Sequence, residues 1–479
     1  MIESPLLPHT QGYIDGEWCT GSGKTITVTN PANAEELARI DGMSERETLA
    51  AIHAAEGALA HRASRDQRRQ WLLRIAEVLQ ANREEVGRIL TLEHGKPWKE
   101  AQGEVDYAAG FFRYCGEHID ELAPRTLDGH PKNATWTVHY RPAGVVALST
   151  PWNFPIGMIA KKLSSALAAD CACIIKPSSK TPLTMIALFT LLQRELDLPR
   201  GKVNLVIGPA GAITDTLMEH PAVRVLSFTG STEVGRELIG KAAPGIKRLT
   251  LELGGNAPFI VFDDADLDAA TDHLIGNKFR GGGQTCVCAN RVFVHRDVAE
   301  TFANRVAERV RSLTVGDGMA EGTDIGPLID ENGVAKVRRH IDDAVAKGAT
   351  KVVEQDVSHL PGTFSPPTVL LDVPTEAVCN VEETFGPLVP MVTFGDEEEV
   401  IAAANDTEFG LAAYLFTADH DRGQRVIERL HFAHATLNTG TGPTPEAPFG
   451  GMKQSGYGRE GGIEGLFEFV EVQTVPVAD

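Results

Sequence analysis

The chain has 479 residues, of which 42% are hydrophobic and 23% are charged. These values are typical of a soluble globular protein of two or three domains that forms its core without disulfide bonds or metal ions. The net charge of −20 disfavours a nucleic-acid partner. The N-terminus lacks a signal-peptide pattern, no apolar run reaches the length of a membrane span, and seven cysteines, an odd number, predict a reducing cytoplasm.

The first predicted elements are helices, because apolar residues recur three and four positions apart from Ser44 to about Leu122. From Pro142 onward, apolar strands alternate with helices. Strands are expected at 145–150, 171–176, 203–208, 223–228 and 258–262. Helices are expected at 158–169, 185–196, 212–220, 232–243, 265–278, 297–312 and 330–347. This alternation predicts an α/β fold with parallel sheets covered on both faces.

Two segments do not fit the alternating pattern. Residues 124–144 are flanked by proline and glycine and contain TWTVHY, which alternates like a hairpin strand. The C-terminal stretch FEFVEVQTV alternates in the same way. We therefore expect the two segments to form an arm that pairs with a neighbouring subunit.

The stretch RGGGQTCVCANR, residues 280–291, holds the strongest candidate for chemistry. A zinc site is disfavoured because no second Cys/His pair lies nearby, and a structural disulfide across two residues would be strained. Three glycines allow close approach of a substrate, and Arg280 and Arg291 would make the surroundings of Cys286 electropositive. The pattern favours a nucleophilic Cys286; a buried turn is the alternative.

Three further stretches place polar side chains beside glycine or proline. Glu252 precedes two glycines in LELGGNAP, where a carboxylate has room to act as a base on water. Asn153 in STPWNFPIG precedes a predicted helix and is a candidate donor to an oxyanion. Glu383 lies in EETFGP. The other interpretations are a surface salt bridge for Glu252 and helix capping for Asn153.

Seven motifs in order resemble the NAD(P)-dependent aldehyde dehydrogenase superfamily: PWNFP, KPSSKTP, FTGSTEVGR, ELGGNAP, GQTC, EETFGP and PFGGMKQSG. The resemblance spans nearly the whole chain and implies a homodimer or homotetramer. It implies a parallel-sheet cofactor domain, an α/β catalytic domain and a small β oligomerisation arm. The expected boundaries are 1–123 and 142–252 for the cofactor domain, 253–440 for the catalytic domain, and 124–141 and 441–479 for the arm and C-terminal segment.

The resemblance also implies catalytic roles. Cys286 matches the nucleophile and Glu252 the base, while Asn153 and the backbone N–H of Cys286 match the oxyanion hole. Lys162 matches a lysine near the catalytic centre. No metal ion is expected.

The implied cofactor is NADP or NAD. Lys176 matches a lysine that faces the adenosine ribose, Ser231 opens a helix whose amides favour a pyrophosphate, and Glu383 matches the carboxylate that holds the nicotinamide ribose. The small, neutral Ser179 favours acceptance of NADP. The remaining residues expected near the cofactor are Gly208, Phe228, Phe385 and Trp152, of which Trp152 is also a candidate for lining the substrate tunnel.

The implied substrate is a small anionic aldehyde, with succinate semialdehyde as the first choice. Arg280 matches an arginine that binds the distal carboxylate, and Lys161 stands where a second arginine is expected. Pro443 replaces an expected serine, so Thr441 and Thr444 are candidates for a replacement hydroxyl. The alternatives are 2-oxoglutarate semialdehyde, glutarate semialdehyde, broad aliphatic aldehydes, or a non-catalytic structural protein.

Cys288 has no role in this chemistry. It is either a small buried core residue or a resolving thiol that forms a reversible disulfide with Cys286.

Overall fold

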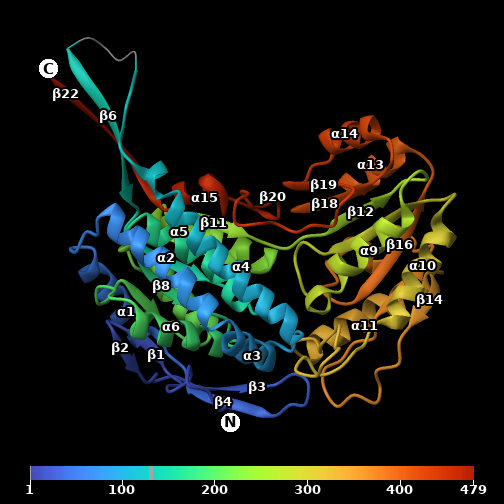
Figure 1. Cartoon of the computed structure of the whole chain (residues 1–479), viewed down its shortest axis with the longest axis horizontal. Helices are drawn as coiled ribbons and strands as arrows, with labels where there is room; N and C mark the ends of the chain where they lie inside the picture. Colours follow the sequence, from blue (N-terminus) through green and yellow to red (C-terminus); the bar gives the residue numbers. More distant parts are fainter. Residues whose placement is uncertain (1, 129–132, 479) are drawn as a thin grey trace.

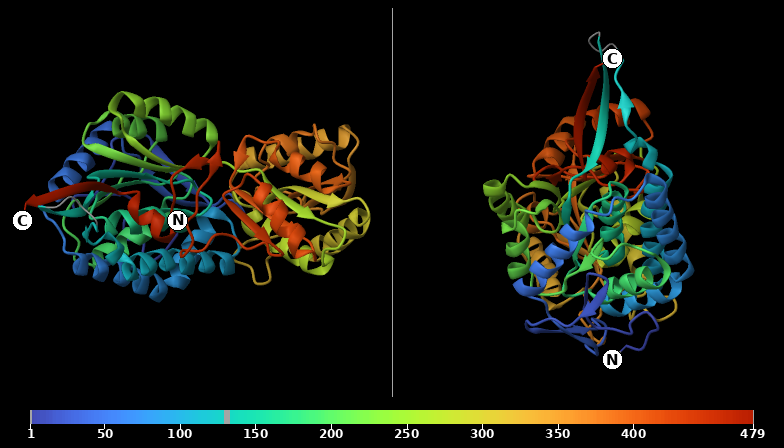
Figure 2. Two further views of the ribbon diagram at one scale, coloured as in Figure 1. Left: turned by 90° about the horizontal axis from the view of Figure 1, so that it is seen from above. Right: turned by 90° about the vertical axis from the view of Figure 1, so that its left-hand side faces the viewer.

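In the computed structural model, which describes residues 2–128 and 133–478, two β-sheets divide the chain into two lobes. Figures 1 and 2 show the lobes side by side, with a thin projection on the first. The first sheet has the order β2-β1-β9-β8-β7-β10-β11-β21. Its strands are β1 (Gly12–Ile14), β2 (Glu17–Cys19), β7 (Val145–Ser149), β8 (Ala172–Lys176), β9 (Val203–Leu205), β10 (Val223–Thr229), β11 (Arg248–Glu252) and β21 (Gly456–Tyr457). The strands from β7 to β11 are mutually parallel, as the apolar runs predicted.

Helices cover both faces of this sheet. Consecutive residues of β7 enter different cores, since Val146 packs with one cluster and Val145 with the other. The expected helices are present, with α1 (Glu45–Ala58), α7 (Ala210–Glu219) and α8 (Thr232–Ala242) on the Val145 side. The Val146 side carries α2 (Arg65–Ala81), α3 (Arg83–His94), α4 (Trp98–Glu117), α5 (Pro155–Ala168) and α6 (Leu183–Glu195). Both faces are therefore buried, which explains the continuous apolar strands.

The second lobe repeats the principle with the order β14-β15-β16-β13-β12-β18-β19. Its strands are β12 (Ala257–Val261), β13 (Ala289–His295), β14 (Thr350–Glu354), β15 (Thr368–Leu371), β16 (Leu388–Phe394), β18 (Ala412–Phe416) and β19 (His434–Leu437). Its helices are α9 (Leu267–Lys278), α10 (Ala299–Ser312), α11 (Glu331–Ala346), α12 (Val378–Val381), α13 (Glu397–Asn405) and α14 (His420–Arg429). All neighbouring strands are parallel except β14 and β15.

The two segments outside the alternating pattern pair with each other. β6 (Ala134–Pro142) lies antiparallel to β22 (Val470–Ala478), and the short β5 (Arg125–Thr126) adds to β6. The pair forms the projection in Figure 1. The strand begins later than FEFVEVQTV indicated, because α15 (Gly462–Phe467) occupies the first residue of that motif. Positions 129–132 of the expected arm, together with residues 1 and 479 of the expected domains, lie outside the described residues.

The rest of the C-terminal segment returns to the lobes. β20 (Met452–Lys453) pairs with β17 (Phe409–Gly410) of the second lobe, and β21 pairs with β11 of the first. The hairpin of β3 (Thr25–Thr29) and β4 (Glu36–Asp41) completes the elements near the N-terminus. The chain changes sheet between Glu252 and Ala257, which agrees with the expected boundary, although the division into domains stays a prediction.

No helix within the described residues combines the length and apolar character that crossing a membrane requires.

Candidate active site

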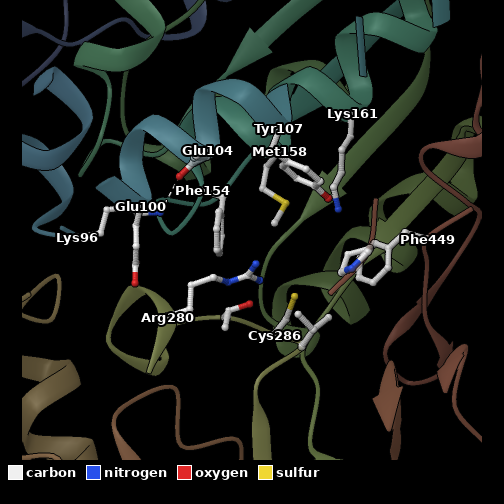
Figure 3. Close-up of a pocket in the computed structure, with 14 residues that line it drawn as sticks. Lys96, Glu100, Glu104, Tyr107, Phe154, Met158, Lys161, Arg280, Cys286 and Phe449 are labelled. Atoms are coloured by element: carbon white, nitrogen blue, oxygen red, sulfur yellow. Dashed lines mark hydrogen bonds and ion pairs between the residues drawn. The ribbon is translucent and has the colours of Figure 1, made fainter. Parts of the chain in front are cut away.

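Two cavities meet at Cys286. One, here called the tunnel, has a volume of about 360 Å³, and the other, here called the cleft, about 350 Å³. The tunnel is lined by Lys96, Glu100, Gly103, Glu104, Tyr107, Phe154, Met158, Lys161, Arg280, Thr285, Cys286, Val287, Pro443 and Phe449 (Figure 3). The cleft wall includes Trp152, Asn153, Met158, Lys180, Ser231, Gln284, Cys286, Asp330, Lys336, Glu383 and Phe385. The thiol can therefore meet groups that arrive from either side.

The glycines before Cys286 shape its loop. Gly281, Gly282 and Gly283 have φ values of 58°, 67° and 77°. Residues other than glycine rarely adopt this left-handed backbone conformation. A Cβ at Gly283 would lie 2.3 Å from the carbonyl oxygen of Gly386, and a Cβ at Gly255 would lie 2.3 Å from that of Cys286. These close backbone contacts require glycine and fix where the thiol lies.

The Cys286 thiol is neutral at rest. Burial raises its pKa to about 12, and the negative charge of Glu383 adds to that rise. The expected electropositive surroundings are only partly present, because the Arg291 guanidinium donates to the carbonyls of Asn256, Ala403 and Ala404. Lys161 supplies a positive charge that acts in the opposite direction.

This raised pKa predicts a steep pH dependence of alkylation. Below the pKa the thiolate fraction rises tenfold per pH unit, so inactivation of the apoenzyme by iodoacetamide should accelerate about a hundredfold from pH 7 to pH 9. The second-order rate constant is measured by residual activity, with peptide mapping to confirm that Cys286 is the modified residue. A rate that levels off below pH 9 would contradict the raised pKa.

Asn153 lies beside the cysteine loop. Its side chain is 4% exposed, its Nδ2 donates to the carbonyl of Gln284 at 3.0 Å, and its Oδ1 has no hydrogen-bond partner among the described residues. The residue precedes α5, whose first residue is Pro155, as the sequence predicted. One N–H of the amide is thus oriented by a carbonyl of the cysteine loop, and the second N–H can donate to a developing oxyanion.

Glu252 ends strand β11 and is 3% exposed. Neither carboxylate oxygen has a hydrogen-bond partner among the residues described, so the alternative of a surface salt bridge is excluded. Burial raises its pKa well above the usual range, and the nearby Glu460 raises it further. Glu252 lines neither cavity, yet its charge contributes to the pKa of Cys286, so it is within electrostatic reach of the thiol.

The neighbouring lysines of α5 point in different directions. Lys162 lines neither cavity; its Nζ donates to Ser227 Oγ at 3.0 Å and forms a buried ion pair with Glu460. Lys161 faces the tunnel, with its Nζ 4.1 Å from the ring centroid of Phe449. Burial alone would lower the pKa of Lys161. Electrostatic interactions, of which those with Tyr107 and Glu460 are the largest, outweigh this effect and raise the pKa, so Lys161 remains an ammonium.

Arg280 supplies a further cation to the tunnel, which Lys96 and Lys161 also line. Its guanidinium carbon lies 5.3 Å from the ring centroid of Phe154, and Figure 3 shows the group extending into the tunnel beside Cys286. Within the described part of the chain, no hydrogen bond or ion pair engages this guanidinium. Thr441 and Thr444 are exposed and do not line the tunnel, whereas Pro443 does. The structure therefore does not bring the expected replacement hydroxyls to the tunnel.

One helix supplies tunnel residues that the sequence analysis missed. Glu100, Glu104 and Tyr107 of α4 all face the tunnel. They share one face at helical spacing, and that face continues to the buried Phe111. Polar residues on the apolar face of a predicted helix were the available signal.

Four residues predicted for the cofactor line the cleft: Trp152, Ser231, Glu383 and Phe385. The rings of Trp152 and Phe385 meet edge to face, with centroids 5.6 Å apart. Ser231 caps α8, whose N-terminal amides open toward the cleft. Glu383 accepts from Gly255 N at 3.1 Å through one oxygen, and burial raises its pKa to about 7. These three features fit a dinucleotide. The aromatic rings suit a flat ring, the helix N-terminus suits a phosphate, and the second oxygen of Glu383 can accept from a sugar hydroxyl.

The other four predicted cofactor residues lie outside the cleft. Ser179 Oγ donates to the carbonyl of Gly208 at 3.1 Å, which brings these two residues together. Lys176 ends β8, donates to Pro177 O at 3.0 Å, and has a pKa lowered to about 8 by burial. Phe228 lies near the end of β10 and packs against Gly230.

Cys288 faces away from the cavities. It is 3% exposed, its Sγ donates to Gly283 O at 3.3 Å, and Lys278 Nζ lies 3.7 Å from the sulfur. Burial raises its pKa. These contacts favour the packing interpretation, and the disulfide with Cys286 stays a prediction.

A thiol at the junction of two cavities, with an amide donor and a carboxylate nearby, is the arrangement expected of an enzyme that forms a covalent adduct. The sequence profile of the aldehyde dehydrogenase family matches residues 18–475. A succinate-semialdehyde dehydrogenase [NADP(+)] of Escherichia coli (strain K12) is 47% identical over 470 residues, 98% of this chain and 97% of that protein. A glutarate-semialdehyde dehydrogenase of Pseudomonas aeruginosa is 46% identical over 98% of each chain.

Among solved structures, an oxidoreductase from Marinobacter aquaeolei superimposes with a TM-score of 0.97 at 61% identity, covering 99% of this chain and 100% of that one. The chain therefore belongs to the aldehyde dehydrogenase family. This confirms the family, the fold class and the oxidoreductase class that the seven motifs indicated.

Proposed function

We propose that the enzyme oxidises a short ω-oxo acid, with succinate semialdehyde as the first candidate, to the dicarboxylic acid with NADP or NAD. The observation that carries this proposal is the Arg280 guanidinium in the tunnel that leads to Cys286, which no described residue engages by a hydrogen bond or ion pair. Lys161 adds a further positive charge to the same tunnel. The two relatives compared above are dehydrogenases of succinate and glutarate semialdehydes, which supports an anionic aldehyde as the substrate.

The residues divide the chemistry among them. Cys286 gives up its proton to solvent water and its sulfur bonds to the aldehyde carbon, as the carbonyl π bond opens to an oxyanion. The side-chain amide of Asn153 and the backbone N–H of Cys286 donate to that oxyanion. A bound nicotinamide would supply the hydride acceptor, so that loss of hydride from the adduct would leave a thioester on Cys286. Glu252 then accepts a proton from water as the water attacks the thioester, which releases the acid and the thiol. Lys162 forms an ion pair with Glu460, whose charge raises the pKa of Glu252.

For the cofactor, Ser231 and the N-terminus of α8 would hold the pyrophosphate, and Glu383 would hold the nicotinamide ribose. Trp152 and Phe385 would flank the nicotinamide side of the cleft. Lys176, Ser179, Gly208 and Phe228 would form the adenosine end.

We further propose that the enzyme is a cytoplasmic homodimer or homotetramer assembled through β6 and β22. Val472 and Val477 on β22 are 64% and 58% exposed, which leaves apolar side chains on the arm for a second subunit to cover.

The proposed function is tested by comparing kcat/KM for succinate, glutarate and 2-oxoglutarate semialdehydes with that for butanal. Formation of reduced cofactor is followed by absorbance. The kcat/KM for at least one of the semialdehydes should exceed that for butanal. An equal kcat/KM for butanal would support a broad aliphatic aldehyde dehydrogenase. No turnover of any aldehyde would support the non-catalytic alternative.

The Arg280→Ala variant should lose affinity selectively for the anionic substrate. A lost charge-assisted contact costs about 1.5–3 kcal/mol, which corresponds to about a tenfold to hundredfold rise in KM for succinate semialdehyde. The KM for butanal is the internal control and should stay nearly constant. If both values rise together, Arg280 only supports the cysteine loop.

The Ser179→Glu variant should shift cofactor preference toward NAD. A carboxylate at this position would repel a 2′-phosphate, so kcat/KM with NADP should fall about tenfold or more while the value with NAD changes little. Ser178→Glu, at the adjacent position, is the control variant. A strong preference of the wild type for NAD would contradict the role given to Ser179.

A further inference from the structure

Lys96 is a buried cation that the proposed reaction does not use. It lies between α3 and α4, and its side chain is 2% exposed. Its Nζ donates to Glu104 Oε2 at 2.6 Å and to the backbone carbonyl of Asn153 at 2.8 Å, and it lies 4.0 Å from the ring centroid of Phe154. The ammonium is therefore engaged by protein groups, in contrast to the guanidinium of Arg280 in the same tunnel.

Glu104 completes the contact to the segment that carries Asn153. Its second oxygen, Oε1, accepts from Ile156 N at 3.0 Å and from Gly157 N at 3.1 Å. These are amides of the first turn of α5, which has no side-chain cap of its own. Lys96 and Glu104 thus hold the main chain on both sides of Phe154, at residue 153 and at residues 156–157.

The other end of this connection is anchored in the second lobe. The loop at Gly95 and Lys96 packs against two glycines of that lobe, since a Cβ at Gly326 would lie 1.9 Å from Gly95 O and one at Gly318 would lie 2.5 Å from Lys96 O. Trp98 N donates to Gly318 O at 2.9 Å. The position of Lys96 is therefore set by the lobe that also carries Cys286.

We propose that Lys96 and Glu104 are positioning residues that set the Asn153 amide toward the oxyanion of the adduct on Cys286. A buried ion pair contributes little to stability by itself, and its strict geometry suits the fixing of a backbone. Loss of the contact from Lys96 would leave the Asn153 carbonyl free to move, and small displacements at a reacting centre cost large factors in rate. This inference rests on the proposed function, because it assigns the oxyanion role to Asn153.

The Lys96→Met variant tests the proposal because methionine keeps the length and removes the ammonium. The value of kcat should fall about tenfold to a hundredfold with both succinate semialdehyde and butanal, while KM for each aldehyde changes little. In the Lys96→Met/Asn153→Ala double variant the loss should equal that of Asn153→Ala alone, since Lys96 acts through Asn153.

Two further variants and a measurement of thermal unfolding complete the test. Glu104→Gln retains an acceptor for Ile156 and Gly157 but removes the charge that holds Lys96, so it should lower kcat for both aldehydes less than Lys96→Met does. If Lys96→Met fails to fold, Glu104→Gln and Lys96→Arg take its place, and Lys96→Arg should retain most of the activity. Thermal unfolding of each variant separates lost positioning from lost fold.

Three results would overturn the role proposed for Lys96, and a fourth would refute the proposed function. A loss confined to KM for succinate semialdehyde would make Lys96 a carboxylate anchor and overturn the proposal, as would unchanged kcat. Fully additive losses in the double variant would show that Lys96 does not act through Asn153. A wild type that oxidises neither aldehyde would refute the proposed function itself.

Discussion

The Cys286→Ser variant should lose aldehyde oxidation by roughly three orders of magnitude or more. An alcohol is a far poorer nucleophile than a thiolate, and no second thiol lines the tunnel within the described residues. The nearby Cys288 is buried and donates to Gly283 O. Steady-state formation of reduced cofactor with succinate semialdehyde measures the loss. Cofactor binding, followed by fluorescence titration, should be unchanged.

Cys288→Ser is the matched control for this prediction. It makes the same atomic substitution two residues away, at a position that lines neither cavity, and should retain most of the activity. Substantial turnover by Cys286→Ser would mean that another group attacks the aldehyde.

The second large effect is expected for Glu252→Gln. The amide cannot accept a proton from water, so the thioester on Cys286 should accumulate and steady-state turnover should fall roughly a hundredfold or more. Stopped-flow measurement should show a burst of reduced cofactor near one equivalent per active site, followed by slow turnover.

The pH profile gives an independent test of the same role. The raised pKa of Glu252 means that the carboxylate forms only as the pH rises above that value, so deacylation in the wild type should accelerate with increasing pH. Glu252→Gln should lose this acceleration. Glu464→Gln, an exposed carboxylate on α15, is the control. An unaltered steady state in Glu252→Gln would assign water activation to another residue.

The parallel strands were predictable because both of their faces are buried. Val145 and Val146 contact different cores, so β7 reads as an unbroken apolar run in the sequence. The short strands were not predictable in this way. β21 is only two residues long, and its pairing with β11 depends on where the C-terminal segment is placed by the rest of the fold.

The residues of the site also divide into those that a local motif identifies and those that only the fold brings together. Cys286, Asn153 and Glu383 lie beside glycine or proline, so local motifs identify them. Lys96 and Glu104 act through contacts with residues about fifty positions away, and such contacts leave no local pattern. The pKa of Cys286 depends on its burial and on the charge of Glu383, so the surroundings of the thiol are less electropositive than the adjacent Arg280 and Arg291 predicted.

The junction of the tunnel and the cleft has a consequence for inhibitor design. Met158 and Cys286 line both cavities, so a molecule that occupies both would pass these two side chains. Its acidic end would meet Arg280, and its aromatic end would meet the rings of Trp152 and Phe385. Linking two weak fragments in this way gains affinity from effective concentration. Selectivity among relatives would come from the acidic end, because it contacts Lys161 and Pro443, the two positions at which this tunnel departs from the expected pattern.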